Sequence, residues 1–370
     1  MLLVPGKTKA KGALTIMRLR MMPAFLTSRS ARRKRLPVLV AALAAVGMGT
    51  SPAVAGAGEL RAATGATSVS LELDWVPNPD HVSLYYAKEK GFFSKAGLNA
   101  DFLVPSDVTD PIKLVGLNKV DLAISYESEL FYAQQEKLPV EAVSTVVPVP
   151  LNSLIVLPRF HVTRLSQMKG KTLGITGIPS DGAIYQMLLK TAHLTAKEVP
   201  TVTVGADLVP AVLSGKVDAI LGGYRNVEAI QIAQELGKKP TVFPASELGV
   251  PNYAELVLVA NRNRLGSDPA YASEVKSFVG ALTYATAAAI ADPAGTTSIM
   301  ERVTQYTTEF LKVSVPYTLS LIKPAAGQKI GCMSEAGWQS FGNWMKSESL
   351  ISIVPNASVL TTDQYLPYSC

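Results

Sequence analysis

The chain has 370 residues, of which 48% are hydrophobic and 17% charged, and its formal net charge is +6. A basic balance favours polyanionic partners such as nucleic acid, but here the charge is unevenly spread. Residues 1–55 hold ten of the 35 Lys and Arg residues and no acid, so the remainder has 25 basic against 29 acidic residues. We therefore expect no nucleic-acid partner.

The basic segment leads into the apolar run 36–48, and a small-x-small cleavage pattern, Ala53-Val54-Ala55, follows. This order predicts a cleavable secretory signal over residues 1–55. The apolar run is shorter than the roughly 20 residues that span a bilayer, which disfavours a retained anchor. Arg32-Arg33 leaves twin-arginine export open beside the general route. We expect a soluble periplasmic protein whose residues 56–67 form a flexible N-terminus.

Beyond this point, strand and helix patterns alternate along the chain. The first unit has expected strands and helices in the order 69–75 (strand), 82–95 (helix), 100–104 (strand), 110–117 (helix), 121–125 (strand) and 127–136 (helix). The second unit has strands at 154–157 and 170–176, a turn at 177–182, a helix at 183–193, and a short helix and strand within 207–220. This alternation predicts an α/β fold of mixed, mainly parallel sheets flanked by helices.

The two units look like copies of one design. Lys119-Val120-Asp121 and Lys216-Val217-Asp218 lie 97 residues apart, each between a short helix and an apolar strand. After the strand 256–260 the chain reads as helices, at 269–291, 293–311, 316–322 and 334–347. We therefore expect a lobe I of residues 68–152 and 256–370 and a lobe II of residues 153–255, hinged over a ligand cleft.

The segment Asp74 to His81 marks one wall of that cleft. It follows a buried strand, and its two prolines prevent further strand pairing, so it forms a polar loop before a helix. Open α/β sheets bind ligands outside the carboxyl ends of their strands. The sequence thus places a ligand mouth at this loop.

The two cysteines, Cys332 and Cys370, allow two interpretations. In an oxidising compartment they would form a disulfide that ties down the C-terminal tail. The alternative is two unpaired, partly buried thiols. None of the three histidines stands at metal-ligand spacing to another His or Cys, so no metal site is predicted.

Several motifs together resemble the periplasmic solute-binding proteins of ABC importers that are related to the thiamine-pyrimidine synthase group. They are Asp74-Trp75-x-Pro77-Asn78-x-x-His81, Gly170-Lys171-x-Leu173-Gly174, Tyr224-x-Asn226-x-Glu228, and Gly249-Val250-Pro251-Asn252-Tyr253-x-Glu255. The resemblance implies a two-lobed, type II periplasmic binding protein without a cofactor. It implies a monomer that delivers 4-amino-5-hydroxymethyl-2-methylpyrimidine, or its formylaminomethyl analogue, to an inner-membrane permease and its ATPase.

The candidate ligand residues are aromatic or polar, and all but Ser180 and Arg225 come from the resemblance. They are Asp74, Trp75, Asn78, His81, Tyr126, Glu127, Ser180, Tyr224, Arg225, Asn226, Glu228, Tyr253 and Glu255. Aromatic side chains would stack on the ring, and carboxylates or amides would accept from its amine. Each of four candidates also has a purely structural explanation. Trp75 would belong to the core, and Glu228 would interact with the dipole of its helix. His81 would form a hydrogen bond at the start of a helix, and Ser180 would cap one.

Arg225 keeps a different ligand class open. Similar pyrimidine receptors tend to carry an aromatic residue there, whereas an arginine suits an anion such as a sulfonate or nitrate. An enzyme is the more distant alternative, because the synthase branch needs a lysine and a histidine at the positions of Ser125 and Glu129, and a cysteine-rich cluster. We therefore expect a receptor and not an enzyme.

Overall fold

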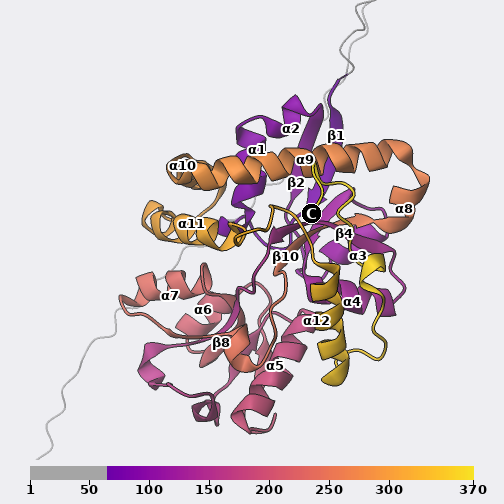
Figure 1. Cartoon of the computed structure of the whole chain (residues 1–370). Coiled ribbons are helices and arrows are strands. Elements are labelled where there is room, and N and C mark those ends of the chain that lie inside the picture. Colours follow the sequence, from indigo (N-terminus) through magenta and orange to yellow (C-terminus); the bar gives the residue numbers. More distant parts are fainter. Residues whose placement is uncertain (1–64) are drawn as a thin grey trace, which may run out of the picture. The chain divides into compact units, whose positions relative to one another are not determined.

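The computed structural model describes residues 65–370, which contain two five-stranded sheets and their covering helices (Figure 1). The predicted signal segment 1–55, and residues 56–64 of the predicted flexible segment, lie outside the described residues. The first sheet has the order β2-β1-β3-β10-β4. Its strands are β1 (Thr67–Glu72), β2 (Leu98–Leu103), β3 (Leu122–Ser125), β4 (Val140–Val147) and β10 (Leu256–Asn261). Thr67 pairs with Leu98, so the sheet begins inside the segment expected to be flexible.

The second sheet repeats this plan with the order β7-β6-β8-β5-β9. Its strands are β5 (Asn152–Val156), β6 (Leu173–Ile175), β7 (Thr201–Thr203), β8 (Ala219–Tyr224) and β9 (Thr241–Pro244). In both sheets the first three strands pair in parallel and the last two pairings are antiparallel. The predicted duplication and the α/β class are confirmed. We call the parts built on the first and second sheets lobe I and lobe II.

Twelve α-helices cover these sheets in the described part of the chain. Lobe I carries α1 (Val82–Glu89), α2 (Phe92–Lys95), α3 (Pro111–Gly116), α4 (Glu127–Gln135), α8 (Arg262–Ser267), α9 (Pro269–Ala291), α10 (Pro293–Val303), α11 (Thr308–Ile322) and α12 (Glu335–Ser347). Lobe II carries α5 (Pro179–Ala192), α6 (Leu208–Leu213) and α7 (Glu228–Leu236).

The cores follow from strand alternation. In β3, Leu122 and Ile124 join the cluster that contains Phe278 of α9, whereas Ala123 between them joins the cluster of Phe131 in α4. Successive residues of this fully buried strand therefore face helices on opposite sides of the sheet. A third cluster, around Ile220, lies between the second sheet and helices α6 and α7 (Figure 1).

Three predicted helix boundaries were wrong. The helix expected over 82–95 is divided at Gly91, whose φ of 74° lies in the left-handed region that glycine adopts freely. The helix expected from Ala183 begins at Pro179, because a proline fits the first helical turn. A break expected before Pro316 is absent, since α10 ends at Val303 and α11 runs from Thr308 through the proline. Pro316 lies on the exposed face of α11, where water can satisfy the carbonyl that it leaves unpaired.

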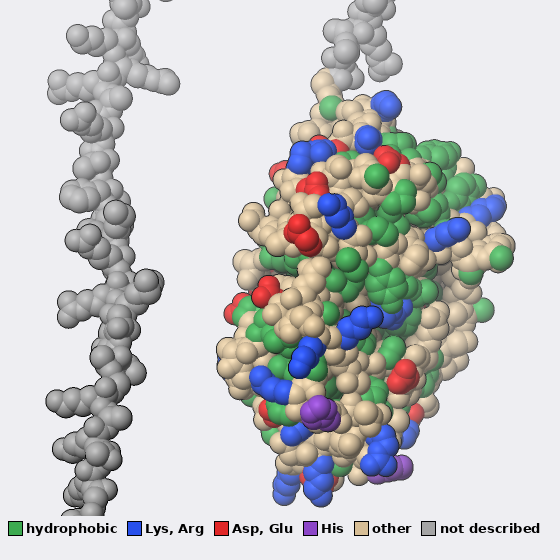
Figure 2. Space-filling view, turned by 90° about the vertical axis from the view of Figure 1, so that its left-hand side faces the viewer, with side chains coloured by type: hydrophobic (Ala, Val, Ile, Leu, Met, Phe, Trp, Pro, Cys, Tyr) green, Lys and Arg blue, Asp and Glu red, His purple; other side chains and the backbone are tan. Residues whose placement is uncertain are grey.

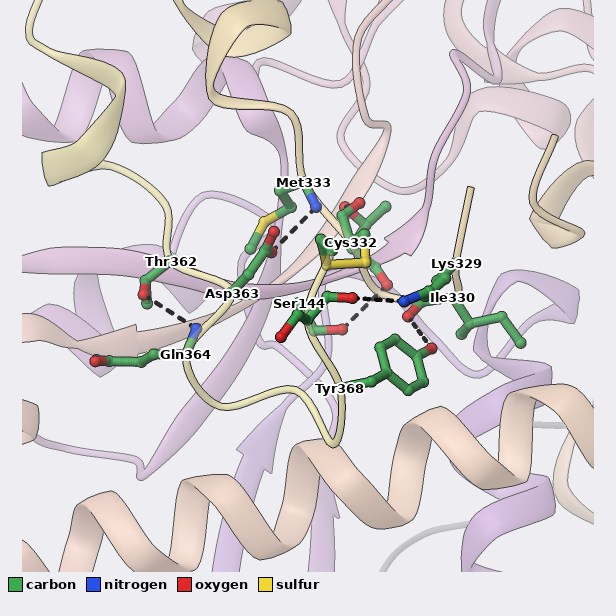
Figure 3. The surroundings of a disulfide bond; sticks show 12 residues. Ser144, Lys329, Ile330, Cys332, Met333, Thr362, Asp363, Gln364 and Tyr368 are labelled. Carbon is green, nitrogen blue, oxygen red and sulfur yellow. Dashed lines mark hydrogen bonds between the residues drawn. A yellow bond between two sulfur atoms is a disulfide. The ribbon is translucent and has the colours of Figure 1, made fainter. Parts of the chain in front are cut away.

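Cys332 and Cys370 form a disulfide, so the paired interpretation is confirmed (Figure 3). Around it, Tyr368 donates its hydroxyl to Ile330 O at 2.6 Å, and Met333 N donates to Asp363 Oδ1 at 3.1 Å. Asp363 approaches both sulfurs, but oxidised sulfurs supply no thiolate ligands for a metal. The tail is thus anchored to lobe I.

Two general features of the described residues bear on partners. None of their helices is long and apolar enough to cross a membrane. On the face drawn in Figure 2, the Lys and Arg side chains are interspersed with acidic and hydrophobic ones and form no continuous stripe.

Candidate functional site

A cavity with about 470 Å³ of empty space, partly open to solvent, lies between the two sheets. Lobe I and the segment that leads into β10 contribute Asp74, Trp75, Asn78, Asp80, Tyr126 and Glu255 to its lining. Lobe II contributes Asn152, Thr176, Ile178, Ser180, Asp181, Leu208, Gly222, Tyr224 and Glu228. Most of these residues follow the carboxyl ends of β1, β3, β6 and β8, where the sheet topology favours a ligand.

The loop after β1 is held by its own side chains. Asn78 Oδ1 accepts from Asp80 N at 2.7 Å and caps the short turn Pro79–His81. His81 Nδ1 accepts from Asn78 N at 3.3 Å, so the ring carries its proton on Nε2, which donates to Asp74 Oδ1 at 2.8 Å. His81 is fully buried and is not part of the cavity lining. His81 therefore lies outside this lining, where its ring orients Asp74.

Three aromatic side chains line the cavity, namely Trp75, Tyr126 and Tyr224. The Tyr126 hydroxyl donates to Asp74 Oδ2 at 2.9 Å, and the Tyr224 hydroxyl donates to Glu255 Oε1 at 3.3 Å. These bonds fix both phenol rings before any ligand arrives. The cavity therefore offers preoriented aromatic surface to a flat ring.

The polar lining is acidic. It contains Asp74, Asp80, Asp181, Glu228 and Glu255, and no Lys or Arg among the described residues. Burial raises the pKa of Glu228 to about 7 and that of Asp181 to about 6. A small anion would meet these groups without a compensating cation.

Each carboxylate has a partial set of partners. Glu228 Oε2 accepts from Tyr224 N at 2.7 Å. Asp181 Oδ2 accepts from Thr176 N at 2.7 Å. Glu255 Oε2 accepts from Asn152 N at 2.9 Å. This bond joins the start of β5 to the segment just before β10, where the chain passes between the lobes.

Two residues of the lining carry unpartnered acceptors. Among the described residues, Asp80 Oδ2 and Asn152 Oδ1 belong to the cavity lining and are buried side-chain atoms without a hydrogen-bond partner. Buried polar atoms are nearly always hydrogen-bonded, so such atoms indicate a missing donor. Carboxylate and amide oxygens accept hydrogen bonds only. The cavity is thus suited to a ligand that brings N–H or O–H donors.

Four further predicted residues lie outside this cavity lining. Glu127 accepts from Ala254 N at 2.7 Å and fastens α4 to a connection between the lobes. The Arg225 guanidinium donates to Pro150 O. Asn226 is buried against lobe I, with its Nδ2 donating to Thr318 Oγ1 at 2.8 Å. Tyr253 donates to Glu255 Oε2 at 3.0 Å and lines a neighbouring cavity, which shares Asn152, Ser180 and Glu255 with the first.

Ser180 lies in the lining, but its amide is already bound. Ser180 N, at the start of α5, donates across the lobes to Glu129 Oε1 at 3.0 Å. Burial raises the pKa of Glu129 to about 7. The N-terminus of α5 is therefore occupied by a carboxyl group of the chain itself.

The sequence analysis missed seven lining residues. Asp80, Thr176 and Asp181 are polar and adjoin motifs already singled out, so their position beside strand ends was a usable signal. Asn152, Ile178, Leu208 and Gly222 also line the cavity, but they lie outside the motifs that were singled out.

Comparison with known sequences gives a family and named relatives. A family model described as NMT1/THI5 like matches residues 78–296. A protein of Haemophilus influenzae named as a thiamine biosynthesis protein is 37% identical over 225 residues, 61% of this chain and 70% of that protein. The formylaminopyrimidine-binding protein of Halalkalibacterium halodurans is 36% identical over 194 residues, 52% of this chain and 58% of that protein.

More distant relatives carry an enzyme name. The 4-amino-5-hydroxymethyl-2-methylpyrimidine phosphate synthase of Uromyces fabae is 26% identical over 237 residues, 61% of this chain and 68% of that protein.

Comparison with solved structures shows the fold. A ligand-binding component of an ABC-type import system from Staphylococcus aureus has a TM-score of 0.62 at 12% identity, covering 81% of this chain and 97% of that one. The alkanesulfonate-binding protein of Xanthomonas axonopodis pv. citri, bound to MOPS, has a TM-score of 0.62 at 15% identity. The match covers 81% of this chain and 99% of that one. The two-lobed fold is that of periplasmic binding proteins.

Proposed function

Since the chain belongs to the NMT1/THI5-like family, we propose that it is the periplasmic receptor of an ABC importer for a thiamine precursor. The ligand is 4-amino-5-hydroxymethyl-2-methylpyrimidine or its formylaminomethyl analogue, held in the cavity between the lobes. The receptor acts as an exported monomer, after removal of the predicted signal over 1–55, and delivers its ligand to a permease with its ATPase.

The observation that carries this proposal is the acceptor-rich lining, to which residues 65–370 contribute no Lys or Arg. An aminopyrimidine presents an exocyclic amine and a hydroxyl or formamide N–H, which are the donors that Asp80 Oδ2 and Asn152 Oδ1 lack. Trp75, Tyr126 and Tyr224 supply aromatic surface for the ring.

An anion receptor on the same fold is less well supported. The basic side chain that suggested it, Arg225, is engaged with the backbone of Pro150. The Ser180 amide is bound to Glu129. An anion in this cavity would lie among carboxylates, at an electrostatic cost that nothing in the lining offsets.

An enzymatic role is also less well supported. Ser125 and Glu129 line a second cavity, which shares Asp74 and Tyr126 with the first. A serine cannot form the Schiff base that a lysine forms, and Glu129 is committed to the Ser180 amide. These residues support a receptor without catalysis.

Thermal unfolding tests the proposal. Micromolar 4-amino-5-hydroxymethyl-2-methylpyrimidine should raise the melting temperature, because a ligand that binds only the folded state stabilises it. Taurine and nitrate at the same concentration should leave it unchanged. Stabilisation by taurine or nitrate alone would support the anion receptor instead.

A further inference from the structure

A single carboxyl group, that of Asp80, connects the cavity with the contact between the lobes. Asp80 belongs to lobe I, in the turn Pro79–His81, and is 1% exposed. Its Oδ1 accepts from Asn226 Nδ2 of lobe II at 2.6 Å. Its Oδ2 has no partner among the described residues, although Asp80 lines the cavity. One carboxyl oxygen of Asp80 thus holds the contact between the lobes, and the other is unpartnered.

The partner residue, Asn226, is held firmly by lobe I. It is 0% exposed, follows β8, and donates from Nδ2 to Thr318 Oγ1 of α11 at 2.8 Å as well as to Asp80. Its backbone oxygen accepts from the Ser314 hydroxyl, also on α11. Asn226 is thus the point at which the β8–α7 connection of lobe II docks into lobe I, and Asp80 is one side of that docking point.

We infer that Asp80 couples ligand binding to lobe closure, because one of its oxygens holds Asn226 of lobe II while the other accepts a hydrogen bond from the amine of the ligand. This inference rests on the proposed function, since it takes an aminopyrimidine as the ligand class. Beyond that function, it assigns the ligand's amine to Asp80 and links this contact to lobe closure.

The electrostatics of the site favour a donor at this oxygen. Burial raises the pKa of Asp80 well above its ordinary value, and the nearby Glu228, Asp74 and Glu255 raise it further, whereas the bond from Asn226 lowers it. Ionised Asp80 is therefore costly without a second donor. An amine at Oδ2 supplies that donor, and the charged carboxylate then binds Asn226 more strongly. Closure and amine recognition reinforce each other.

The first test needs no mutation. Two probes are titrated into the wild-type protein, 4-amino-5-hydroxymethyl-2-methylpyrimidine and the same molecule without its amine. The amino probe should bind at least about tenfold more tightly, the effect of a hydrogen bond to a charged group. Equal affinity for both probes would overturn the inference while leaving pyrimidine binding intact. Binding of neither probe would overturn the inference and the proposed function together.

Variants then separate the two oxygens. Asp80→Asn keeps an oxygen for Asn226 but presents an amide N–H toward the ligand, so its preference for the amino probe should disappear. Asn226→Ala should bind the amino probe more weakly and keep a reduced preference for it, because Asp80 Oδ2 remains while the coupling to Asn226 is lost. The control Asp101→Asn removes a carboxylate on the exposed face of β2 and should change neither property.

The double variant measures the coupling. If Asp80 acts as inferred, Asp80→Asn with Asn226→Ala should bind the amino probe within about threefold of the weaker single variant. Small-angle scattering should show less ligand-induced compaction for either single variant than for the wild type. The coupling would be contradicted if the affinity losses of the two single variants multiplied in the double variant. It would also be contradicted if Asp80→Asn compacted on ligand binding as much as the wild type. The melting temperature of each ligand-free variant shows whether it is folded. If a variant is misfolded, the comparison of the two probes in the wild type decides the inference.

Discussion

At the scale of single residues, Glu228 is the predicted ligand carboxylate whose position best fits its role. It begins α7, lines the cavity, and uses Oε2 to accept from Tyr224 N at 2.7 Å. Glu228→Gln should weaken aminopyrimidine binding by about 1.5–3 kcal/mol, because an acceptor at the end of the side chain becomes partly a donor. Titration calorimetry measures this change, and the exposed Glu235→Gln on the same helix is the control. Unchanged affinity in Glu228→Gln would remove Glu228 from the site.

Residue types near strand ends could be predicted from the sequence, but the direction of each side chain could not. Asp74, Trp75 and Asn78 follow β1 and reach the cavity as expected. His81, only three residues after Asn78, turns inward to Asp74 because the capped turn directs it there. Arg225 suggested an anion by its charge, yet it bonds Pro150 O, a contact that exists only once the connections between the lobes are packed.

At the scale of elements, the order of strands and helices was predictable because periodicity and punctuating glycines and prolines are local signals. The irregularity in β8 was not. The pairing of β5 with β8 shifts register between Ser153 and Leu154, and Gly222 takes a φ of 96° at that point. A Cβ on Gly222 would lie 2.9 Å from Asp181 Oδ1. This bulge lets the strand end beside the cavity, and it depends on the partner strand rather than on local sequence.

The disulfide makes a prediction about the C-terminal tail. Cys332 and Cys370 are separated by 38 residues in sequence, and closing a loop of that length stabilises a fold by about 2–4 kcal/mol. Cys370→Ser should lower the free energy of unfolding by this amount in denaturant titrations under oxidising conditions. Reductant should bring the wild type to the level of the variant and leave the variant unchanged. A wild type that is insensitive to reductant would contradict a stabilising role for the bond.

At the scale of the whole molecule, buried carboxyl groups should make stability depend on pH. Burial raises the pKa of Glu127 to about 8, and those of Glu129, Glu141 and Glu228 to about 7. The folded state then holds more protons than the unfolded state between about pH 4.5 and 8, so stability falls as pH rises through this window. Glu198, whose pKa its bond to Lys169 lowers to about 2, acts below that window.

Denaturant unfolding of the ligand-free protein should therefore give a larger free energy at pH 5.5 than at pH 8. Glu141→Gln should reduce this difference, because it removes one of the carboxyl groups whose pKa burial raises. Glu141 lies on β4, outside the cavity lining, so the substitution does not alter the lining itself. Equal stability at the two pH values would show that these carboxyl groups ionise in the folded protein as readily as in the unfolded chain.

The central claim is that the acidic, aromatic cavity between the lobes selects an aminopyrimidine over an anion. Isothermal titration of the purified protein with 4-amino-5-hydroxymethyl-2-methylpyrimidine, taurine and nitrate tests it most directly. We expect saturable one-to-one binding of the pyrimidine at micromolar concentrations and no heat of binding from either anion. Saturable binding of taurine or nitrate with none of the pyrimidine would contradict it.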